Sequence, residues 1–247
     1  LFKCDISGMP IYFDNTVSIG AANAPVGFVA DTLTLHSLQR IDDALWSIPS
    51  RPGEAWRFCA NRNIDGSNWL IRADDPHRFA IPARYNRVMP SPQRAEDRER
   101  LHKLGAAQRH LFYSILRLGL PCRGRDVDAP HGLVFDFLQD SSDPDGKLIP
   151  AMTGHEDGLI SLRAAEADDD VRETVRVSMG EPYRTLLGHF RHEIGHFYFQ
   201  QLVARSDMLE DARRLFGDER EDYAAALKRN YEQGPPSDWP EHFISTY

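Results

Sequence analysis

The sequence has few cysteines. Three thiols occur among 247 residues, at Cys4, Cys59 and Cys122, and they are widely separated and odd in number. This pattern excludes a disulfide framework, and it also excludes a complete set of cysteine ligands for a metal ion. So few thiols suit a reducing compartment, and we expect a cytoplasmic protein.

Long hydrophobic runs and an excess of positive charge are also missing. No apolar stretch approaches the length that crosses a membrane, so we expect no membrane contact. Residues 1–5 lack the features of a signal peptide, although a processed chain would look similar. The formal net charge is −8, from 37 acidic and 29 basic residues, which argues against nucleic acid as a partner. The 41% of hydrophobic residues are enough to form a buried core.

Residues 1–92 predict a small region of short strands and turns. The segment is rich in Pro, Gly, Asn and Asp, and its apolar runs are short, as at residues 10–13 and 26–29. The sequence Met89-Pro90-Ser91-Pro92 ends this pattern, and a helical pattern follows it directly. We therefore place a domain boundary here, with residues 1–92 as a β- and loop-rich region and residues 93–247 as a second domain.

The second domain predicts helices around a small sheet, so the fold class is α+β. The spacing of apolar residues indicates a long helix over residues 94–118. Apolar runs predict strands at residues 133–138 and 158–162, and the second of these is a candidate edge strand. A polar stretch then begins, which we interpret as solvated surface; its acidic residues are Glu166, Asp168, Asp169 and Asp170.

Three further helices are predicted towards the C-terminus. Pro182 suits a first helical turn, and residues 183–203 continue this helix. The other two helical patterns cover residues 208–216 and 219–231, before Gly234-Pro235-Pro236 ends them.

The first of these helices carries the motif His192-Glu193-Ile194-Gly195-His196. Four residues separate the two histidines, so both imidazoles lie on one helix face, one turn apart, where they can share a zinc ion. The carboxylate of Glu193 projects beside them and can accept a proton from a metal-activated water, then return it to a leaving amine. The motif therefore predicts His192 and His196 as metal ligands and Glu193 as the catalytic general base.

Bulky apolar residues surround the motif, which predicts a helix buried beneath the floor of an active site. They are Leu186, Leu187, Phe190, Phe197 and Phe199. Two histidines and a glutamate in so apolar a helix would be costly without a partner, which favours a metal site over a structural histidine pair. His189 could donate a hydrogen bond to the site, but we favour a capping or surface histidine.

A catalytic zinc ion takes three protein ligands and a water, so one more ligand is required. Four carboxylates follow at a suitable separation, although each is also typical of a solvated acidic helix: Asp218, Glu219, Glu221 and Asp222. A third histidine in a Gly-x-x-His extension is missing, because Phe197-Tyr198-Phe199 follows the motif directly.

The segment from Gly180 to His196 resembles the bacterial zinc-binding metallopeptidases that carry an N-terminal zinc-ribbon-like region. Other stretches of nearly the whole chain resemble this family too: residues 2–4, 68–70, 73–76, 116–121, 135–138, 153–155 and 216–220. The resemblance implies a ribbon-like region followed by a zincin-like metallopeptidase domain. It also implies one zinc ion per chain, with His192 and His196 as ligands and Glu193 as the base.

The chain departs from the family pattern in two ways. The paired cysteines of the ribbon correspond here to Cys4, Ser7, Ser18 and Ala21, and to Cys59, Ser67, Ala80 and Ala83. One thiol per cluster cannot hold zinc with four ligands, so we predict that the N-terminal region folds without metal. Similar proteins also continue past the position of Tyr247 into an acidic helix expected to supply a glutamate ligand. The third ligand is therefore Glu219, Asp222 or a residue beyond Tyr247, or else the site is incomplete and binds metal weakly.

These features favour a cytoplasmic zinc metallopeptidase of gluzincin-like architecture that acts on a peptide or protein substrate. An edge strand could align that substrate by backbone pairing. One alternative is a non-catalytic protein-binding module with a structural or vestigial metal site, which would bind a protein partner through its N-terminal region. Another is a metallohydrolase that acts on bonds other than peptides.

Overall fold

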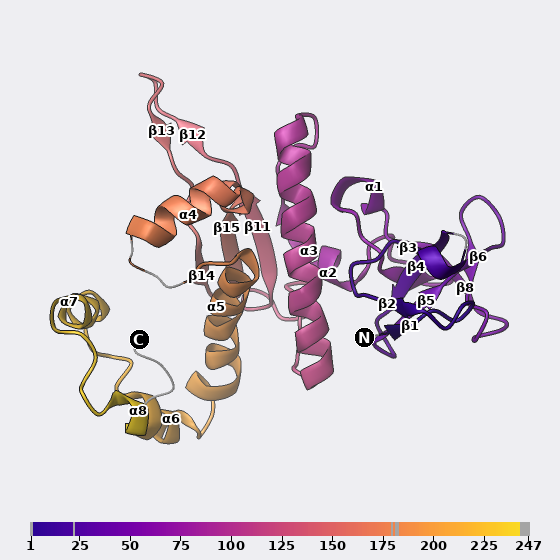
Figure 1. The fold of residues 1–247 in the computed structure, drawn as a ribbon. Coiled ribbons are helices and arrows are strands. Elements are labelled where there is room, and N and C mark those ends of the chain that lie inside the picture. The colour runs from indigo at the N-terminus through magenta and orange to yellow at the C-terminus, as the bar shows by residue number, and fades with distance from the viewer. Residues whose placement is uncertain (1, 22, 179, 181–182, 243–247) are drawn as a thin grey trace. The chain divides into compact units, whose positions relative to one another are not determined.

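The computed structural model describes residues 2–21, 23–178, 180 and 183–242. It divides into two compact units, residues 1–195 and residues 196–247, and each is described by itself. Figure 1 shows the order of helices and strands along both units. No helix among the described residues is long and apolar enough to cross a membrane.

The N-terminal region is built from short antiparallel strands, as predicted. They form three small sheets: β1 (Phe2–Lys3) with β2 (Pro10–Ile11); β3 (Val17–Ser18), β4 (Ala24–Val29) and β5 (Thr34–Ser37); and β6 (Gln39–Arg40), β7 (Trp46–Ser47), β8 (Ala55–Phe58) and β9 (Leu70–Arg72). Three short helical segments connect them: η1 (Ile19–Ala21), α1 (Arg62–Asp65) and α2 (Ile81–Arg84). The strands enclose a hydrophobic cluster that includes Val29, Trp56 and Leu70. Burial of these side chains, rather than long strands, defines the core of this region.

Helix α3 (Ala95–Leu118) confirms the long helix that the apolar spacing predicts. Its buried residues recur at helical spacing, as at Leu104, Leu111 and Ile115. The helix ends at Gly119, whose φ of 64° places it in the left-handed conformation that glycine adopts without strain.

Two faces of α3 contact different parts of the first unit. On one face, the Tyr113 ring lies 5.2 Å from the Phe13 ring, centroid to centroid, and Arg109 pairs with Asp65 at 3.7 Å. On the other, the Phe112 ring lies 6.2 Å from Phe135. The helix therefore joins the N-terminal region to the sheet that follows.

That sheet has the strand order β10 (Asn86–Val88), β11 (Val134–Leu138), β15 (Leu159–Arg163) and β14 (Gly154–Glu156). The first three strands are parallel, and β14 is antiparallel to β15. Strand β11 confirms the strand predicted at residues 133–138. The expectation that residues 158–162 form an edge is wrong, because β15 lies between two strands and β14 forms the edge.

Strand β10 precedes residue 92 in the sequence but pairs with β11. A boundary after residue 92 therefore separates a strand from its sheet partner. The predicted boundary stays a prediction.

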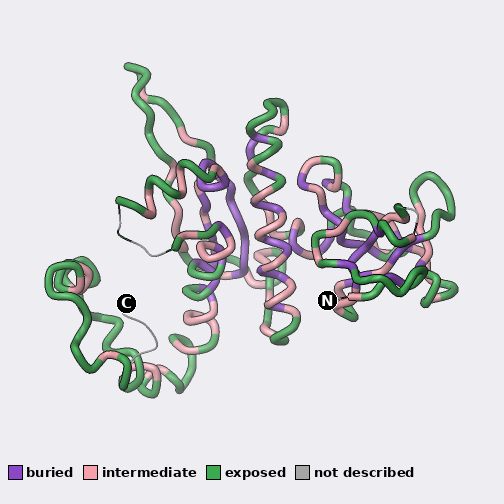
Figure 2. Tube along the Cα trace, viewed as in Figure 1, coloured by how far each residue is buried: buried purple, intermediate pink, exposed green. Residues whose placement is uncertain are grey.

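Helices α3 and α5 (Leu186–Phe199) pack against the same face of this sheet. The Phe135 ring of β11 contacts Phe112 of α3 and, at 5.8 Å between centroids, Phe190 of α5. The register pairs Phe135 with Ile160 and Phe137 with Leu162, so these four buried side chains share the face that the helices cover. Strand β11 is the largely buried strand of this sheet, as Figure 2 shows.

The remaining elements of the first unit are small. Strands β12 (Ser141–Ser142) and β13 (Leu148–Ile149) form a hairpin, and the 3-10 turn η2 (Ala164–Ala167) leads into α4 (Asp169–Ser178). Neither the hairpin nor α4 has a buried residue in its regular segment, so both lie at the surface, including the apolar Leu148 and Ile149 of β13.

The second unit is helical. After α5, a π-helical segment covers Gln200–Ala204, followed by α6 (Leu209–Phe216), α7 (Tyr223–Gln233) and α8 (Trp239–His242). Two predicted helices thus lie close to their expected places, but α7 begins four residues later than predicted. The reason is local, because the Asp222 carboxylate accepts a hydrogen bond from the Ala225 amide at 2.9 Å and caps the helix.

Candidate metal centre

Helix α5 begins at Leu186, three residues after the start predicted at Tyr183. The hydroxyl of Thr185 accepts a hydrogen bond from the Gly188 amide at 3.0 Å, which caps the first turn. The predicted role of Pro182 falls outside the described residues. The helix then continues to Phe199, so the whole motif at residues 192–196 lies within it.

The two sides of α5 differ in burial. Leu186, Phe190 and Ile194 recur every four residues and are 8%, 0% and 6% exposed, so they form the stripe that packs inward. His192 and His196 follow the same spacing on another stripe, and both are exposed. Glu193 lies between the two stripes and is 8% exposed.

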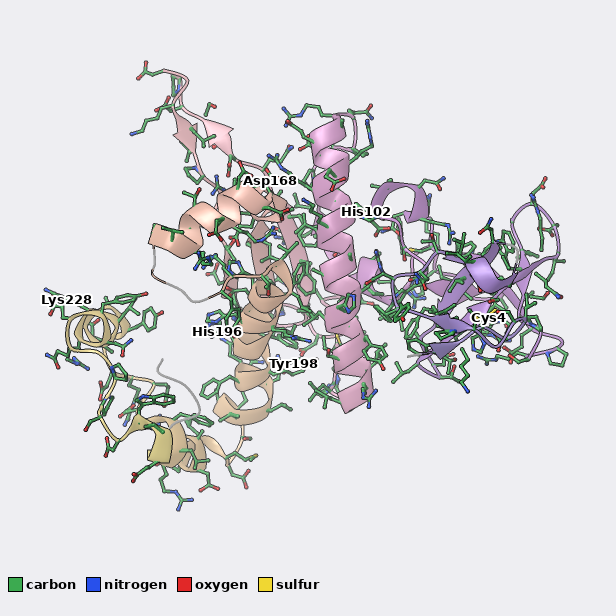
Figure 3. The ribbon with its side chains drawn as sticks, in the orientation of Figure 1. Cys4, His102, Asp168, His196, Tyr198 and Lys228 are labelled. Atoms are coloured by element: carbon green, nitrogen blue, oxygen red, sulfur yellow. The ribbon has the colours of Figure 1, made fainter. Side chains whose placement is uncertain are left out.

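The expectation of a motif helix buried beneath the floor of an active site is therefore wrong at the two histidines, which are exposed. The cost of burying two histidines is therefore no argument for a metal, because both imidazoles reach solvent. What the structure provides instead is a pair of accessible imidazoles, one turn apart on α5, with a buried carboxylate beside them. His196 and Tyr198 are labelled on α5 in Figure 3.

Within the described part of the chain, no three His, Cys, Asp or Glu side chains gather in a way that could hold a metal ion. The carboxylates expected as third ligands have local partners in the second unit. Glu219 pairs with Arg213 at 2.5 Å, and Asp222 caps α7. Asp218 pairs with Arg220 and Glu221 with Arg229, so all four belong to exposed surface.

A buried ion pair lies close to the motif in the sequence. Glu166 of η2 is 7% exposed and pairs through Oε2 with Nδ1 of His189 on α5. Its other oxygen accepts a hydrogen bond from the Thr153 hydroxyl at 2.5 Å, and the Arg184 guanidinium lies 3.9 Å from Oε2. Burial alone would raise the pKa of the Glu166 carboxyl. The hydrogen bonds from His189 and Thr153 outweigh burial, so this pKa lies below its ordinary value.

Two expectations are corrected by this pair. Glu166 was expected on solvated surface, and His189 was expected as a capping or surface histidine, but they pair with each other in a largely buried place. One feature of the sequence could have indicated that Glu166 is buried, because three alanines surround it, Ala164, Ala165 and Ala167. All three are buried in the structure. Asp168, from the same acidic stretch, pairs with Arg100 of α3 at 2.6 Å.

Thr153 immediately precedes the edge strand β14, and its hydroxyl also accepts a hydrogen bond from the Arg163 amide at 3.0 Å. Glu166 therefore connects the start of the edge strand to the first turns of α5. This connection fixes the helix that carries the motif to β14, which is one of the two edge strands of this sheet.

Comparison with known proteins places the chain in a family. Residues 97–247 match the family model described as "Putative zinc-binding metallo-peptidase", and residues 1–94 match a model for a zinc-ribbon domain. The chain belongs to this metallopeptidase family.

Relatives of the chain occur in mycobacteria. Uncharacterized proteins of Mycobacterium tuberculosis and Mycobacterium bovis are each 37% identical to it over 247 residues, which is 100% of this chain and 67% of theirs. No solved structure matches the chain.

The family description implies zinc, and α5 fits a zinc ion in part. Neutral imidazoles at a spacing of four residues are common zinc ligands, and the exposure of His192 and His196 leaves room for further ligands and a substrate. In the N-terminal region the fit is different. Cys4 and Cys59 are each 2% exposed, and each thiol is hydrogen-bonded, Cys4 with the Ser37 hydroxyl and Cys59 with the Ala80 amide.

Proposed function

We propose that the chain acts as a zinc-dependent peptidase, with His192 and His196 as zinc ligands and Glu193 as the general base. The observation that carries this proposal is the division of α5 into two sides. One side packs against the sheet through Phe190, and the other presents both imidazoles to solvent beside the Glu193 carboxylate.

A zinc ion held by the two imidazoles would polarise the scissile carbonyl group. Glu193 accepts the proton of the attacking water and delivers it to the departing amine, which is the work of a positioned general acid and base. Packing of Phe190 and Ile194 limits the movement of α5, so Glu193 stays beside the two histidines while the proton moves.

Strand β14 is suited to hold the peptide. It is the antiparallel edge of the sheet, so its outer backbone groups can pair with an extended chain. The Glu166 carboxylate, which binds both Thr153 and His189, keeps this strand in a fixed relation to α5. We propose that the Glu166–His189 pair positions the two parts of the site rather than reacting with the substrate.

The third zinc ligand is also a proposal. Glu219 and Asp222 would each have to leave a present partner, Arg213 or the Ala225 amide, to bind a metal. We therefore propose that the third ligand is one of these two carboxylates after such a change of partner, or a residue beyond Tyr247.

We further propose that the protein works in a reducing compartment such as the cytoplasm. Cys4 and Cys59 are buried and hydrogen-bonded, an arrangement that needs no oxidation for stability. A protein-binding module remains the second candidate function. The lost cysteine pairs of the N-terminal region favour it, because a ribbon that gives up its metal can still bind a protein partner.

The direct test is peptide hydrolysis by the wild type and by Glu193→Gln. We expect a loss of about 10²- to 10⁴-fold in kcat, with zinc content unchanged, because the variant removes the base and keeps both imidazoles. Glu173→Gln makes the same change on exposed α4 and should leave activity intact. Hydrolysis that persists in Glu193→Gln, or that survives removal of zinc, contradicts the proposal.

A further inference from the structure

Residues 1–94 match a zinc-ribbon model, and each of the two cysteine clusters that the resemblance implies holds a single thiol here, Cys4 or Cys59. We infer that this region folds without zinc, and that hydrogen bonds around Cys4 and Cys59 replace the two metal ions. The inference concerns residues 1–92 alone and does not depend on the proposed peptidase activity.

The first cluster surrounds Cys4, directly after β1 (Figure 3). The Cys4 Sγ atom lies 2.8 Å from the Ser37 hydroxyl and accepts a hydrogen bond from the Ser7 amide at 3.4 Å. Ser7 and Ser18 stand at two of the three positions where a ribbon would have further cysteines, and both side chains lower the pKa of the Cys4 thiol. Serine hydroxyls are not among the usual zinc ligands, which are thiolate, imidazole and carboxylate.

These serines lower the pKa of a thiol, as a bound metal ion would. Burial raises the pKa of the Cys4 thiol, but the hydrogen bonds from Ser18, Ser37 and Ser7 outweigh burial and lower the pKa to about 6. A thiolate at this position is therefore stabilised by neutral donors. A zinc ion is not required to balance its charge.

Other potential ligands near Cys4 are engaged elsewhere. His36 neighbours Ser37 on β5, so their side chains point to opposite faces of the strand. Nδ1 of His36 lies 2.7 Å from the Asp5 carboxylate, and its Nε2 lies 2.8 Å from the Thr34 hydroxyl. Both ring nitrogens thus have partners, and a mixed site of Cys4, His36 and Asp5 would have to break these bonds.

The second cluster surrounds Cys59, directly after β8. Its thiol donates to the Asn61 side chain and accepts a hydrogen bond from the Ala80 amide at 3.0 Å. Ala80 and Ala83 stand where the ribbon pattern has cysteines, and a methyl group cannot bind a metal. Burial raises the pKa of the Cys59 thiol, so this thiol keeps its proton, which is the opposite of a zinc-bound cysteine.

Packing against α3 supplies the stability that a metal gives to an isolated ribbon. The Phe13 ring contacts Phe28 at 5.1 Å, Trp69 at 6.4 Å and Tyr113 of α3 at 5.2 Å. The Asn68 side chain donates to the Phe13 carbonyl at 2.6 Å, which holds this segment in place. An aromatic cluster and a long helix therefore cover the region.

The test is zinc X-ray absorption on the intact chain after equilibration with three equivalents of zinc and removal of excess. We expect no zinc–sulfur shell at about 2.3 Å. In His192→Ala/His196→Ala we expect no retained zinc. A sulfur shell in the wild type, or a zinc retained in the double variant and lost on adding Cys4→Ser, overturns the inference.

A restored variant checks the assignment of the positions. Ser7→Cys/Ser18→Cys/Ala21→Cys should retain about one additional zinc with a sulfur shell, because it completes four thiols with Cys4. Failure of this variant to bind zinc while it stays folded contradicts the view that the hydroxyls occupy a former metal site. A wild type without any zinc would sink the peptidase proposal and leave this inference standing.

Discussion

The family matches imply zinc in two regions of this chain, α5 and the N-terminal region, and the candidate ligands of these two regions differ in exposure. On α5, two imidazoles point to solvent while the opposite side of the helix is packed against a sheet. In the N-terminal region, two thiols are 2% exposed and bonded to neighbouring hydroxyl, amide and carboxamide groups. The comparison teaches that residue type alone does not settle the matter, because the two imidazoles are accessible and the two thiols are not.

The largest expected effect tests the support of the α5 site. Phe190→Ala removes a fully buried ring from the contact with Phe135 and Phe137, and we expect a loss of about 3 to 5 kcal/mol in unfolding free energy. Phe216→Ala removes the same ring from a side chain that is 70% exposed and should cost less than about 1 kcal/mol. Denaturant unfolding measures both. Equal effects would show that α5 is not held by the sheet.

A smaller effect is expected from the connection between α5 and the edge strand. Glu166→Gln leaves His189 without its buried charged partner and should cost about 1 to 3 kcal/mol at pH 7. Glu173→Gln, on exposed α4, serves as the matched control and should change little.

The same variant has a defined pH dependence. Because the pKa of Glu166 is lowered in the folded chain, its ionisation stabilises the fold fully above the ordinary value of 4.5. This contribution is lost as the pH falls through the lower folded pKa. The difference in thermal midpoint between wild type and Glu166→Gln should therefore be constant from pH 6 to 8 and shrink below about pH 4.5. A difference that grows in acid would contradict the assignment.

The effect that is smallest at pH 7 separates the two thiols of the N-terminal region. The pKa of Cys4 is about 6 in the folded chain against an ordinary 9.0, so its thiolate stabilises the fold increasingly as the pH rises from 6 to 9 and adds nothing below 6. Cys4→Ala should lose about 1 kcal/mol from this source at pH 7. The pKa of Cys59 is raised, so Cys59→Ala should show no such growth with pH. Thermal melts at four pH values distinguish the two variants.

Local patterns predicted much of this molecule. Once a helix forms, the spacing of residues 192–196 alone places both histidines on one helix face. The leucine spacing of α3 and the apolar run of β11 were sufficient to predict that helix and that strand. The elements that the sequence did not predict depend on contacts between residues that are far apart in the chain. Strand β14, Gly154–Glu156, has the composition of a turn and becomes a strand because β15 pairs with it.

The Glu166–His189 pair was missed for the same reason. Glu166 occurs in an acidic run, and only the fold brings His189 of α5 to its carboxylate. The start of α5 was misplaced because the proline signal at residue 182 was preferred to the capping hydroxyl of Thr185. In each case a contact, rather than a residue type, decided the outcome.

The most direct test of this account is the zinc content per chain, measured by elemental analysis without added metal. The account predicts about one zinc in the wild type, none in His196→Ala, and about one in Cys4→Ala/Cys59→Ala. Zinc that persists in His196→Ala but disappears from the cysteine double variant would contradict it, because the metal would then belong to the N-terminal region and not to α5.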